Sequence, residues 1–168
     1  MDVTRPMRFL GLLLFATFVG CSSNPLPAKT LPIEASTALR NATTFELFSL
    51  DPTRRNEESE GPAFHDWTIL GSVEVPDNTT RSTLIEAIEA GVAQHREMVA
   101  TCFDPRHGIR VMHDGKKHDF VICFHCYQCR WYIDDERVKG FLLSRSPQSI
   151  FDRVLRNTSI TLAPPPSY

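Results

Sequence analysis

The clearest structural signal in the sequence is the dipeptide Asp114-Gly115, which lies between two runs of strand-forming residues. Such an Asp-Gly connection predicts a β-hairpin closed by a type I′ turn. A two-residue turn fixes the register of the strands, so Arg110 should face Asp119 across the hairpin. On the opposite side of the hairpin, apolar residues should share the core face: Ile109, Val111, Phe120, Ile122 and Phe124.

Three further segments show alternating apolar residues, and this period of two predicts a strand in each: 45–50, 67–75 and 138–143. The second strand of the hairpin carries its alternation through Ile133, so we expect one long strand from His118 to that residue. The charged segment 52–65, which follows the first predicted strand, is expected to be a loop.

Two segments have the periodicity of helices. Apolar residues recur at three- and four-residue spacing after Asp77 and Thr79, which predicts a helix that one of these residues caps and that runs to about Val99. Ser146-Pro147 is typical of a helix start and predicts a second helix. The sequence therefore predicts an α+β fold: an antiparallel sheet of about five strands packed with two helices, in the order strand, strand, helix, strand, strand, strand, helix.

The N-terminus has the features of an export signal. Arg5 and Arg8 precede the uncharged apolar run from Phe9 to Val19. As a helix this run would be only about 16 Å long, half of what a membrane span needs. The run ends at Phe18-Val19-Gly20-Cys21, which resembles a bacterial lipobox, and the resemblance implies that Cys21 is the acylated first residue of the mature protein.

These features predict how the chain is organised and where it resides. We expect a signal peptide at 1–20, a flexible tether at 21–44, a single domain at 45–163 and a tail at 164–168. The protein should face the periplasm or the cell exterior, held in the bacterial cell envelope by a lipid on Cys21. Ser22 after that cysteine favours the outer membrane in a double-membraned cell, by resemblance to lipoprotein sorting rules. The net charge of −2 gives no reason to expect nucleic acid as a partner.

A cluster of cysteines and histidines is the most unusual chemical feature of the chain. Beyond Cys21, the cysteines are Cys102, Cys123, Cys126 and Cys129, and His107 and His125 lie near them in sequence. Three interpretations compete: a zinc site, a redox dithiol and structural thiols that are bridged or buried. In a regular strand Cys123 and Cys126 would point to opposite faces, with Cα atoms about 10 Å apart. That geometry bars them from sharing a metal ion or forming a disulfide.

The predicted hairpin register brings a different cysteine pair together. Extending the register places Cys126 opposite Phe103 and Cys123 opposite Arg106. Cys102 is then the thiol best placed to bridge Cys126 or Cys123, and an oxidising envelope would allow that disulfide. The sequence thus favours structural thiols and predicts no bound cofactor or metal.

Arg106-His107 is a second candidate functional segment. An arginine beside a histidine could bind an anion or take part in acid–base chemistry. The sequence shows no nucleophile elbow, paired carboxylates or glycine-rich phosphate loop to accompany them. The alternative is a turn that simply leads into the first strand of the hairpin.

Three segments carry a family resemblance: CFDPRHGIR at 102–110, DFVICFHC at 119–126 and SRSPQSIFD at 144–152. They resemble a bacterial family of small exported proteins without an assigned function, over about residues 45–163. The resemblance supports the order of elements but implies no catalytic residues.

Three functional hypotheses follow from the sequence. The first is a non-enzymatic binding or structural module of the envelope, whose ligand or protein partner is open. The second is a thiol- or zinc-dependent protein that uses Cys102, His107, Cys123 and Cys126. The third is an enzyme built around Arg106 and His107, which requires both side chains to meet an acidic partner in a pocket.

Overall fold

The computed structural model describes residue 1 and residues 29–55, 60–96 and 100–166. Within these ranges the chain forms three helices and seven strands, and all seven strands belong to one antiparallel sheet. None of the described helices has both the length and the apolar character needed to cross a bilayer. The predicted signal peptide, apart from Met1, and the predicted lipidation site Cys21 lie outside the described residues.

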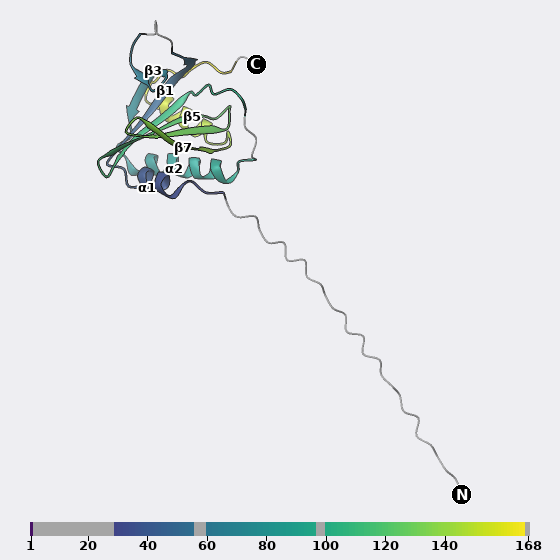
Figure 1. The fold of residues 1–168 in the computed structure, drawn as a ribbon. Coiled ribbons are helices and arrows are strands. Elements are labelled where there is room, and N and C mark those ends of the chain that lie inside the picture. The colour runs from purple at the N-terminus through teal and green to yellow at the C-terminus, as the bar shows by residue number, and fades with distance from the viewer. Residues whose placement is uncertain (2–28, 56–59, 97–99, 167–168) are drawn as a thin grey trace.

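Ten elements make up the described fold. In chain order they are α1 (Ile33–Arg40), β1 (Thr44–Arg54), β2 (Ala63–Phe64), β3 (Trp67–Glu74), α2 (Asn78–Ala93), β4 (His107–His113), β5 (Lys116–Cys123), β6 (Gln128–Ile133), β7 (Glu136–Leu142) and α3 (Gln148–Asn157). The strands lie side by side in the order β2-β3-β1-β4-β5-β6-β7. Figure 1 shows that the sheet curls into a half-barrel, with α1 and α2 beneath it.

The predicted fold of five strands and two helices is therefore wrong. The segment 118–133 is two antiparallel strands, β5 and β6, because the chain turns between Cys123 and Gln128. The segment 52–65, which we expected to be a loop, contains two pieces of strand. β1 continues through Pro52 to Arg54, and β2 pairs with β3. The strands therefore contact mainly one another, and the helices make fewer contacts with the sheet.

The third helix, α1, lies in the segment 21–44 that the sequence predicts to be a flexible tether. Its buried residues Ala35, Ala38 and Leu39 pack into the main core. Arg40 also donates a hydrogen bond of 3.1 Å from Nε to the carboxylate of Glu89 on α2. The folded part of the chain thus begins before residue 45, and any tether is correspondingly shorter.

The Asp114-Gly115 hairpin is confirmed in its register. Arg110 pairs with Asp119 across β4 and β5, and Asp114 and Gly115 have positive φ angles of 49° and 72°. Both central residues of a type I′ turn need such angles. The predicted core-face residues of the hairpin are all buried in the main core: Ile109, Val111, Phe120, Ile122 and Phe124.

The predicted helix after β3 is also present, with an earlier end. Asp77 caps α2, because its carboxylate accepts a hydrogen bond of 2.7 Å from the backbone N–H of Thr80. The helix ends at Ala93 instead of about Val99. The final helix α3 follows Ser146-Pro147 as expected, with Phe151 and Leu155 buried.

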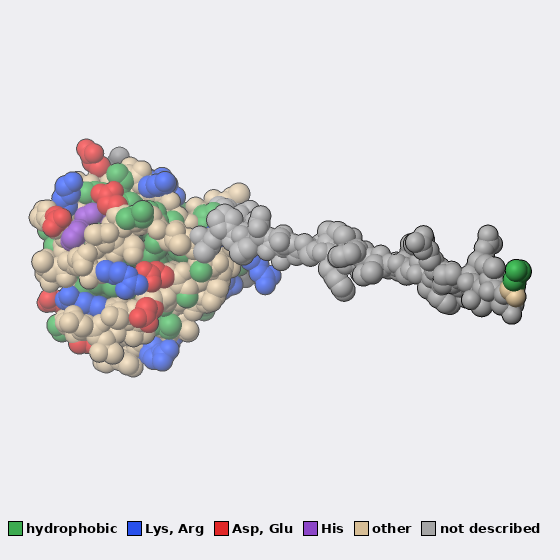
Figure 2. All heavy atoms as spheres, turned by 90° about the horizontal axis from the view of Figure 1, so that it is seen from below, with side chains coloured by type: hydrophobic (Ala, Val, Ile, Leu, Met, Phe, Trp, Pro, Cys, Tyr) green, Lys and Arg blue, Asp and Glu red, His purple; other side chains and the backbone are tan. Residues whose placement is uncertain are grey.

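The sheet has an apolar cluster on each face. The main core lies between the sheet and the helices, whereas a second cluster on the other face is built around Phe48, Phe64 and Trp67. The curl of the sheet lets β2 reach over β4, so a Cβ on Gly108 would lie 2.7 Å from the ring of Phe64. On the outer surface, acidic and basic side chains are interspersed over the face shown in Figure 2.

Candidate functional site

The turn between β5 and β6 carries a disulfide between Cys123 and Cys126, whose Cα atoms are 5.2 Å apart. β5 ends at Cys123, and Tyr127 completes the turn with a positive φ of 60°. Our prediction that these two cysteines point to opposite faces and cannot bridge is wrong. It assumed a continuous strand through residues 123–126, and the chain reverses direction there instead.

Cys102 lies beside this disulfide and keeps a free thiol. Its Sγ is 3.5 Å from the Sγ of Cys126, and its side chain is partly exposed. The backbone N–H of Ala100 donates a hydrogen bond of 3.4 Å to the carbonyl of Cys126, which holds the segment before β4 against the turn. The predicted Cys102–Cys126 or Cys102–Cys123 disulfide is not formed, but the predicted approach of Cys102 to Cys126 is confirmed.

Backbone groups surround the bridged sulfur atoms. The N–H of Asp104 donates to Cys126 Sγ at 3.4 Å, and the N–H of Cys126 donates to Cys123 Sγ at 3.1 Å. The carbonyl oxygen of Asp104 lies 3.3 Å from Cys123 Sγ. Backbone groups of Asp104 and Cys126 thus fix the position of the disulfide in the turn.

Cys129 does not join the three clustered cysteines. It lies on β6, fully buried, and burial raises the pKa of its thiol. His125 lies within the turn, where burial lowers the pKa of its imidazole, and the positive charges of Arg145 and Arg106 act in the same direction. In the described part of the chain, the clustered cysteines are therefore Cys102, Cys123 and Cys126.

The second sequence-predicted site, Arg106-His107, contains a histidine–aspartate pair. His107 is buried at the start of β4, and its Nε2 lies 2.8 Å from Oδ1 of Asp152 on α3. Its ring packs edge-on against Phe124 and Phe151. Within the described chain, no hydrogen bond or ion pair joins His107 to a cysteine, so the proposed set of Cys102, His107, Cys123 and Cys126 is not assembled as one site.

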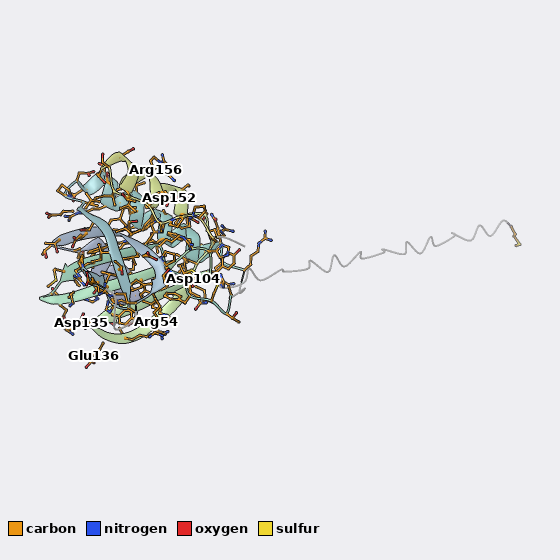
Figure 3. The ribbon with its side chains drawn as sticks, turned by 90° about the horizontal axis from the view of Figure 1, so that it is seen from above. Arg54, Asp104, Asp135, Glu136, Asp152 and Arg156 are labelled. Carbon is orange, nitrogen blue, oxygen red and sulfur yellow. A yellow bond between two sulfur atoms is a disulfide. The ribbon has the colours of Figure 1, made fainter. Side chains whose placement is uncertain are left out.

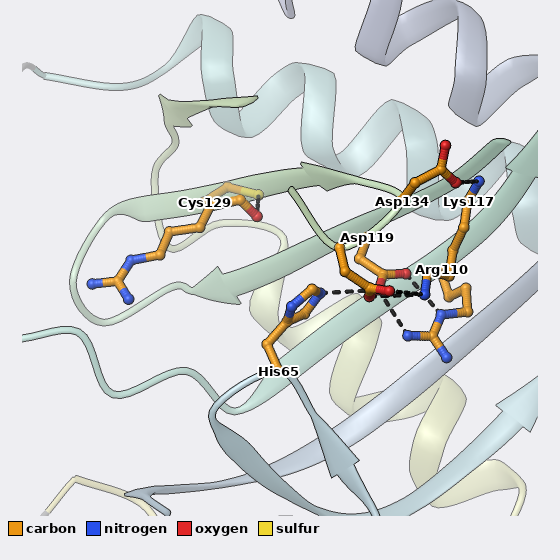
Figure 4. Close-up of polar contacts among 8 residues, drawn as sticks. His65, Arg110, Lys117, Asp119, Cys129 and Asp134 are labelled. Carbon is orange, nitrogen blue, oxygen red and sulfur yellow. Dashed lines mark hydrogen bonds and ion pairs between the residues drawn. The ribbon is translucent and has the colours of Figure 1, made fainter. Parts of the chain in front are cut away.

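A third polar group, which the sequence did not reveal as a site, lies on the face of the sheet opposite the main core, beside Phe48 and Phe64. Figure 4 shows His65 and Arg110 converging on the buried carboxylate of Asp119. Arg110 donates from Nε and Nη2 at 2.8 and 2.7 Å, and His65 Nε2 lies 2.9 Å from the same carboxylate. The His65 ring stacks on Tyr132 with a centroid distance of 3.8 Å.

The charge of Asp119 is maintained by its partners. Burial alone would raise the pKa of Asp119, but the hydrogen bonds from Arg110 and His65 outweigh it and lower that pKa. Asp135 brings a second carboxylate within 4.8 Å of His65 and Asp119, and Lys117 binds it at 2.8 Å. Because each carboxylate already has a cationic partner, this group has no excess negative charge that would attract a metal ion.

The two halves of this third group differ in how well the sequence predicts them. The hairpin register is enough to place Arg110 opposite Asp119. His65 comes from the turn between β2 and β3 and is 54 positions from Asp119 in the chain. Its positive φ of 53° is uncommon for a residue other than glycine and carries no sequence signature here.

Comparison with protein-family models, curated proteins and solved structures gives no significant match for this chain.

Proposed function

We propose that this protein is an envelope lipoprotein whose folded domain exchanges disulfides through Cys102, Cys123 and Cys126. The observation that carries the proposal is the 3.5 Å separation between the free Cys102 sulfur and the bridged Cys126 sulfur. Disulfides rearrange by attack of a thiolate on a disulfide sulfur, so a free thiol at this distance is a poised nucleophile.

The first step of the exchange is internal. Cys102 loses its proton and its sulfur attacks Cys126 Sγ; a Cys102–Cys126 bond forms as the Cys123–Cys126 bond breaks. The leaving Cys123 sulfur takes up a proton, so the protein as a whole is neither oxidised nor reduced. The N–H of Cys126, which donates to Cys123 Sγ, stabilises the negative charge on that leaving sulfur.

The second step transfers the disulfide to a dithiol substrate. A substrate thiolate attacks Cys102 Sγ, and Cys126 leaves with a proton. The second thiolate of the substrate then attacks the mixed disulfide, forming the substrate disulfide and releasing Cys102. The substrate loses two electrons and two protons, and the protein gains both.

The exposure of the three sulfurs supports this division of roles. Cys123 and Cys126 are buried, whereas Cys102 is partly exposed. An external thiol therefore reaches Cys102 before it reaches either bridged sulfur. Internal exchange converts an inaccessible disulfide into one with an accessible end.

The proposed location rests on the sequence of the first 21 residues. The basic segment, the apolar run and Gly20-Cys21 support export and acylation, and the envelope supplies the oxidising conditions that a disulfide needs. The lipid on Cys21 would hold the exchange site near the membrane surface. The non-enzymatic binding module expected from the sequence stays a prediction, and the thiol geometry favours the exchange function over it.

Oxidation of a synthetic dithiol peptide tests the proposal. Oxidised protein is mixed with the reduced peptide, the reaction is stopped by alkylation, and peptide disulfide is measured by mass spectrometry. We expect Cys102→Ser to slow the reaction at least about tenfold, because the remaining disulfide sulfurs are buried. Cys129→Ser is the matched control and should react at the wild-type rate. Equal rates for wild type and Cys102→Ser would overturn the exchange function.

Zinc binding by the reduced protein is a second candidate function. The specific observation in its favour is that backbone N–H groups donate to both Cys123 and Cys126 sulfurs, with Cys102 beside them, so three thiolates could bind one ion with water as the fourth ligand. Metal analysis after reduction and zinc exposure checks this. One equivalent of zinc, lost in Cys102→Ser and kept in Cys129→Ser, would support the metal site, and no retained zinc would exclude it.

A further inference from the structure

A small cavity lies where α3, the start of β4 and the C-terminal segment meet. Its volume is about 240 Å³, below the usual range for drug-sized ligands. Five polar residues line it together with apolar residues of the C-terminal segment: Arg106, His107, Gln148, Asp152 and Arg156. This cavity is separate from the thiol cluster and goes beyond the proposed exchange function.

The helix α3 supplies one wall of the cavity. Gln148, Asp152 and Arg156 follow one another at four-residue spacing, so they lie on one face of the helix. Figure 3 shows Asp152 and Arg156 close together on this helix. This polar row is not needed for packing, because the buried side of α3 is formed by Phe151 and Leu155.

The single carboxylate of the cavity is already compensated. Asp152 Oδ1 lies 2.8 Å from Nε2 of His107, and Asp152 Oδ2 lies 3.5 Å from Nη2 of Arg156. The pair of Asp152 and Arg156 is therefore close to neutral as a unit.

Arg106 leaves an uncompensated positive charge in the same cavity. Its Nε donates to the carbonyl of Pro164 at 2.8 Å, and its Nη1 donates to the carbonyl of Asp104 at 3.2 Å. Carbonyl oxygens fix the orientation of a guanidinium but do not cancel its charge. Its Nη2 has no hydrogen-bond partner in the described part of the chain, so the held guanidinium keeps donor capacity for a ligand.

We infer that this cavity binds a small oxyanion, a carboxylate or a phosphate, with Arg106 as its principal ligand. The two carbonyl contacts hold the planar guanidinium in place, which lowers the entropic cost of binding. Gln148 and Arg156 supply further donors from α3. His107 and Asp152 position these groups by tying the start of β4 to the helix.

Titration of the protein with acetate and, separately, with inorganic phosphate tests the inference by amide NMR shifts. We expect one of the two probes to bind at millimolar concentration with shifts centred on the cavity, and the responding probe identifies the anion class. Arg106→Gln should weaken binding by about tenfold to a hundredfold, the value of a hydrogen bond to a charged group.

Arg153→Gln is the matched control, because it makes the same charge change at an exposed position of α3 that does not line the cavity. It should bind the probe like wild type. Arg156→Gln alters an exposed side chain, should fold normally and should also weaken binding, which keeps the test decisive if Arg106→Gln fails to fold. No shifts with either probe, or equal loss in Arg153→Gln, would overturn the inference.

Discussion

Replacing Arg110 with methionine removes the cation beside the only carboxylate that is buried in the described part of the chain. Asp119 is 1% exposed, and Arg110 binds both of its oxygens. Methionine keeps an unbranched apolar stem next to Phe48 and Phe64, over which the guanidinium lies at present. The substitution therefore removes the charge with little change in packing.

The expected cost follows from the burial of Asp119. Removing one partner of a buried ion pair typically costs about 3–5 kcal/mol, because the other charge is left uncompensated. His65 still contacts Asp119, so we expect the lower end, about 3 kcal/mol. Adding Asp119→Asn to Arg110→Met removes the uncompensated charge of the carboxylate, so the double variant should be more stable than Arg110→Met alone.

The cost should also depend on pH. In the wild-type protein the lowered pKa of Asp119 means that its stabilising effect is present above the pKa of the unfolded chain and is lost as pH falls through the folded value. Without Arg110 the effect of burial dominates and raises this pKa. The deficit of the variant should then be largest at neutral pH and should shrink as the pH falls toward about 4, the ordinary pKa of an aspartate in an unfolded chain.

Urea unfolding followed by tryptophan fluorescence measures these differences, since Trp67 and Trp131 are both buried. Lys117→Met is the matched control: it breaks the pair with Asp135, which is 69% exposed, and should cost no more than about 1 kcal/mol. A loss in Arg110→Met as small as in the control, or one independent of pH, would refute the reasoning.

Three further predictions concern other parts of the chain. Cys21→Ala should abolish acylation and leave unprocessed precursor, which fractionation and mass spectrometry would detect; mature, membrane-bound protein would contradict the lipobox interpretation. Gly108→Ala should lower the free energy of unfolding by about 1–3 kcal/mol, because the new Cβ would lie 2.7 Å from the buried ring of Phe64; an unchanged urea midpoint would contradict it. Asp77→Ala should lower the midpoint of thermal unfolding, because the Thr80 N–H loses its acceptor. Asp77→Ser keeps an acceptor and should unfold at a midpoint close to that of the wild type; an equal decrease in both variants would show that the cap is not responsible.

The sequence predicts the parts of the fold that depend on local signals. The Asp-Gly turn determines the register of β4 and β5, and with it the pairing of Arg110 with Asp119. The capping side chain of Asp77 marks the start of α2. Each of these features is determined within a few residues, where turn chemistry and periodicity are informative.

The missed features depend on distant or unusual residues. Residues 124–127 form a turn without glycine or proline, and Tyr127 takes the positive φ that glycine usually supplies, so the pattern resembles one continuous strand. β1 passes through Pro52 because the pairing with β3 is irregular between Leu50 and Arg54, where a strand can lack a donor. The periodicity of the sequence predicts neither the turn at 124–127 nor the extension of β1 through Pro52.

The candidate sites also depend on contacts between residues that are far apart in the sequence. Cys102 does approach Cys126, but the β4–β5 ladder ends at the pair of His107 and Ile122, so the extended register is not the reason for this contact. The turn that bridges Cys126 to Cys123 is not predicted. Asp152, the partner of His107, lies 45 positions away on α3 and meets it only after the helix packs on the sheet. Such contacts are set by tertiary packing, which a single sequence does not display.

Disulfide mapping of the Cys123→Ser variant tests the proposed exchange most directly. Trypsin would release Cys102 in the peptide 97–106 and both Cys126 and Cys129 in the peptide 118–130. A link between the two peptides, located by fragmentation at Cys126 and not at Cys129, reports the Cys102–Cys126 bond. With the Cys123 sulfur removed, the 3.5 Å separation predicts that this bond forms quantitatively under mild oxidation. A free Cys102 alongside an unpaired Cys126, or a Cys126–Cys129 bond, would contradict the account.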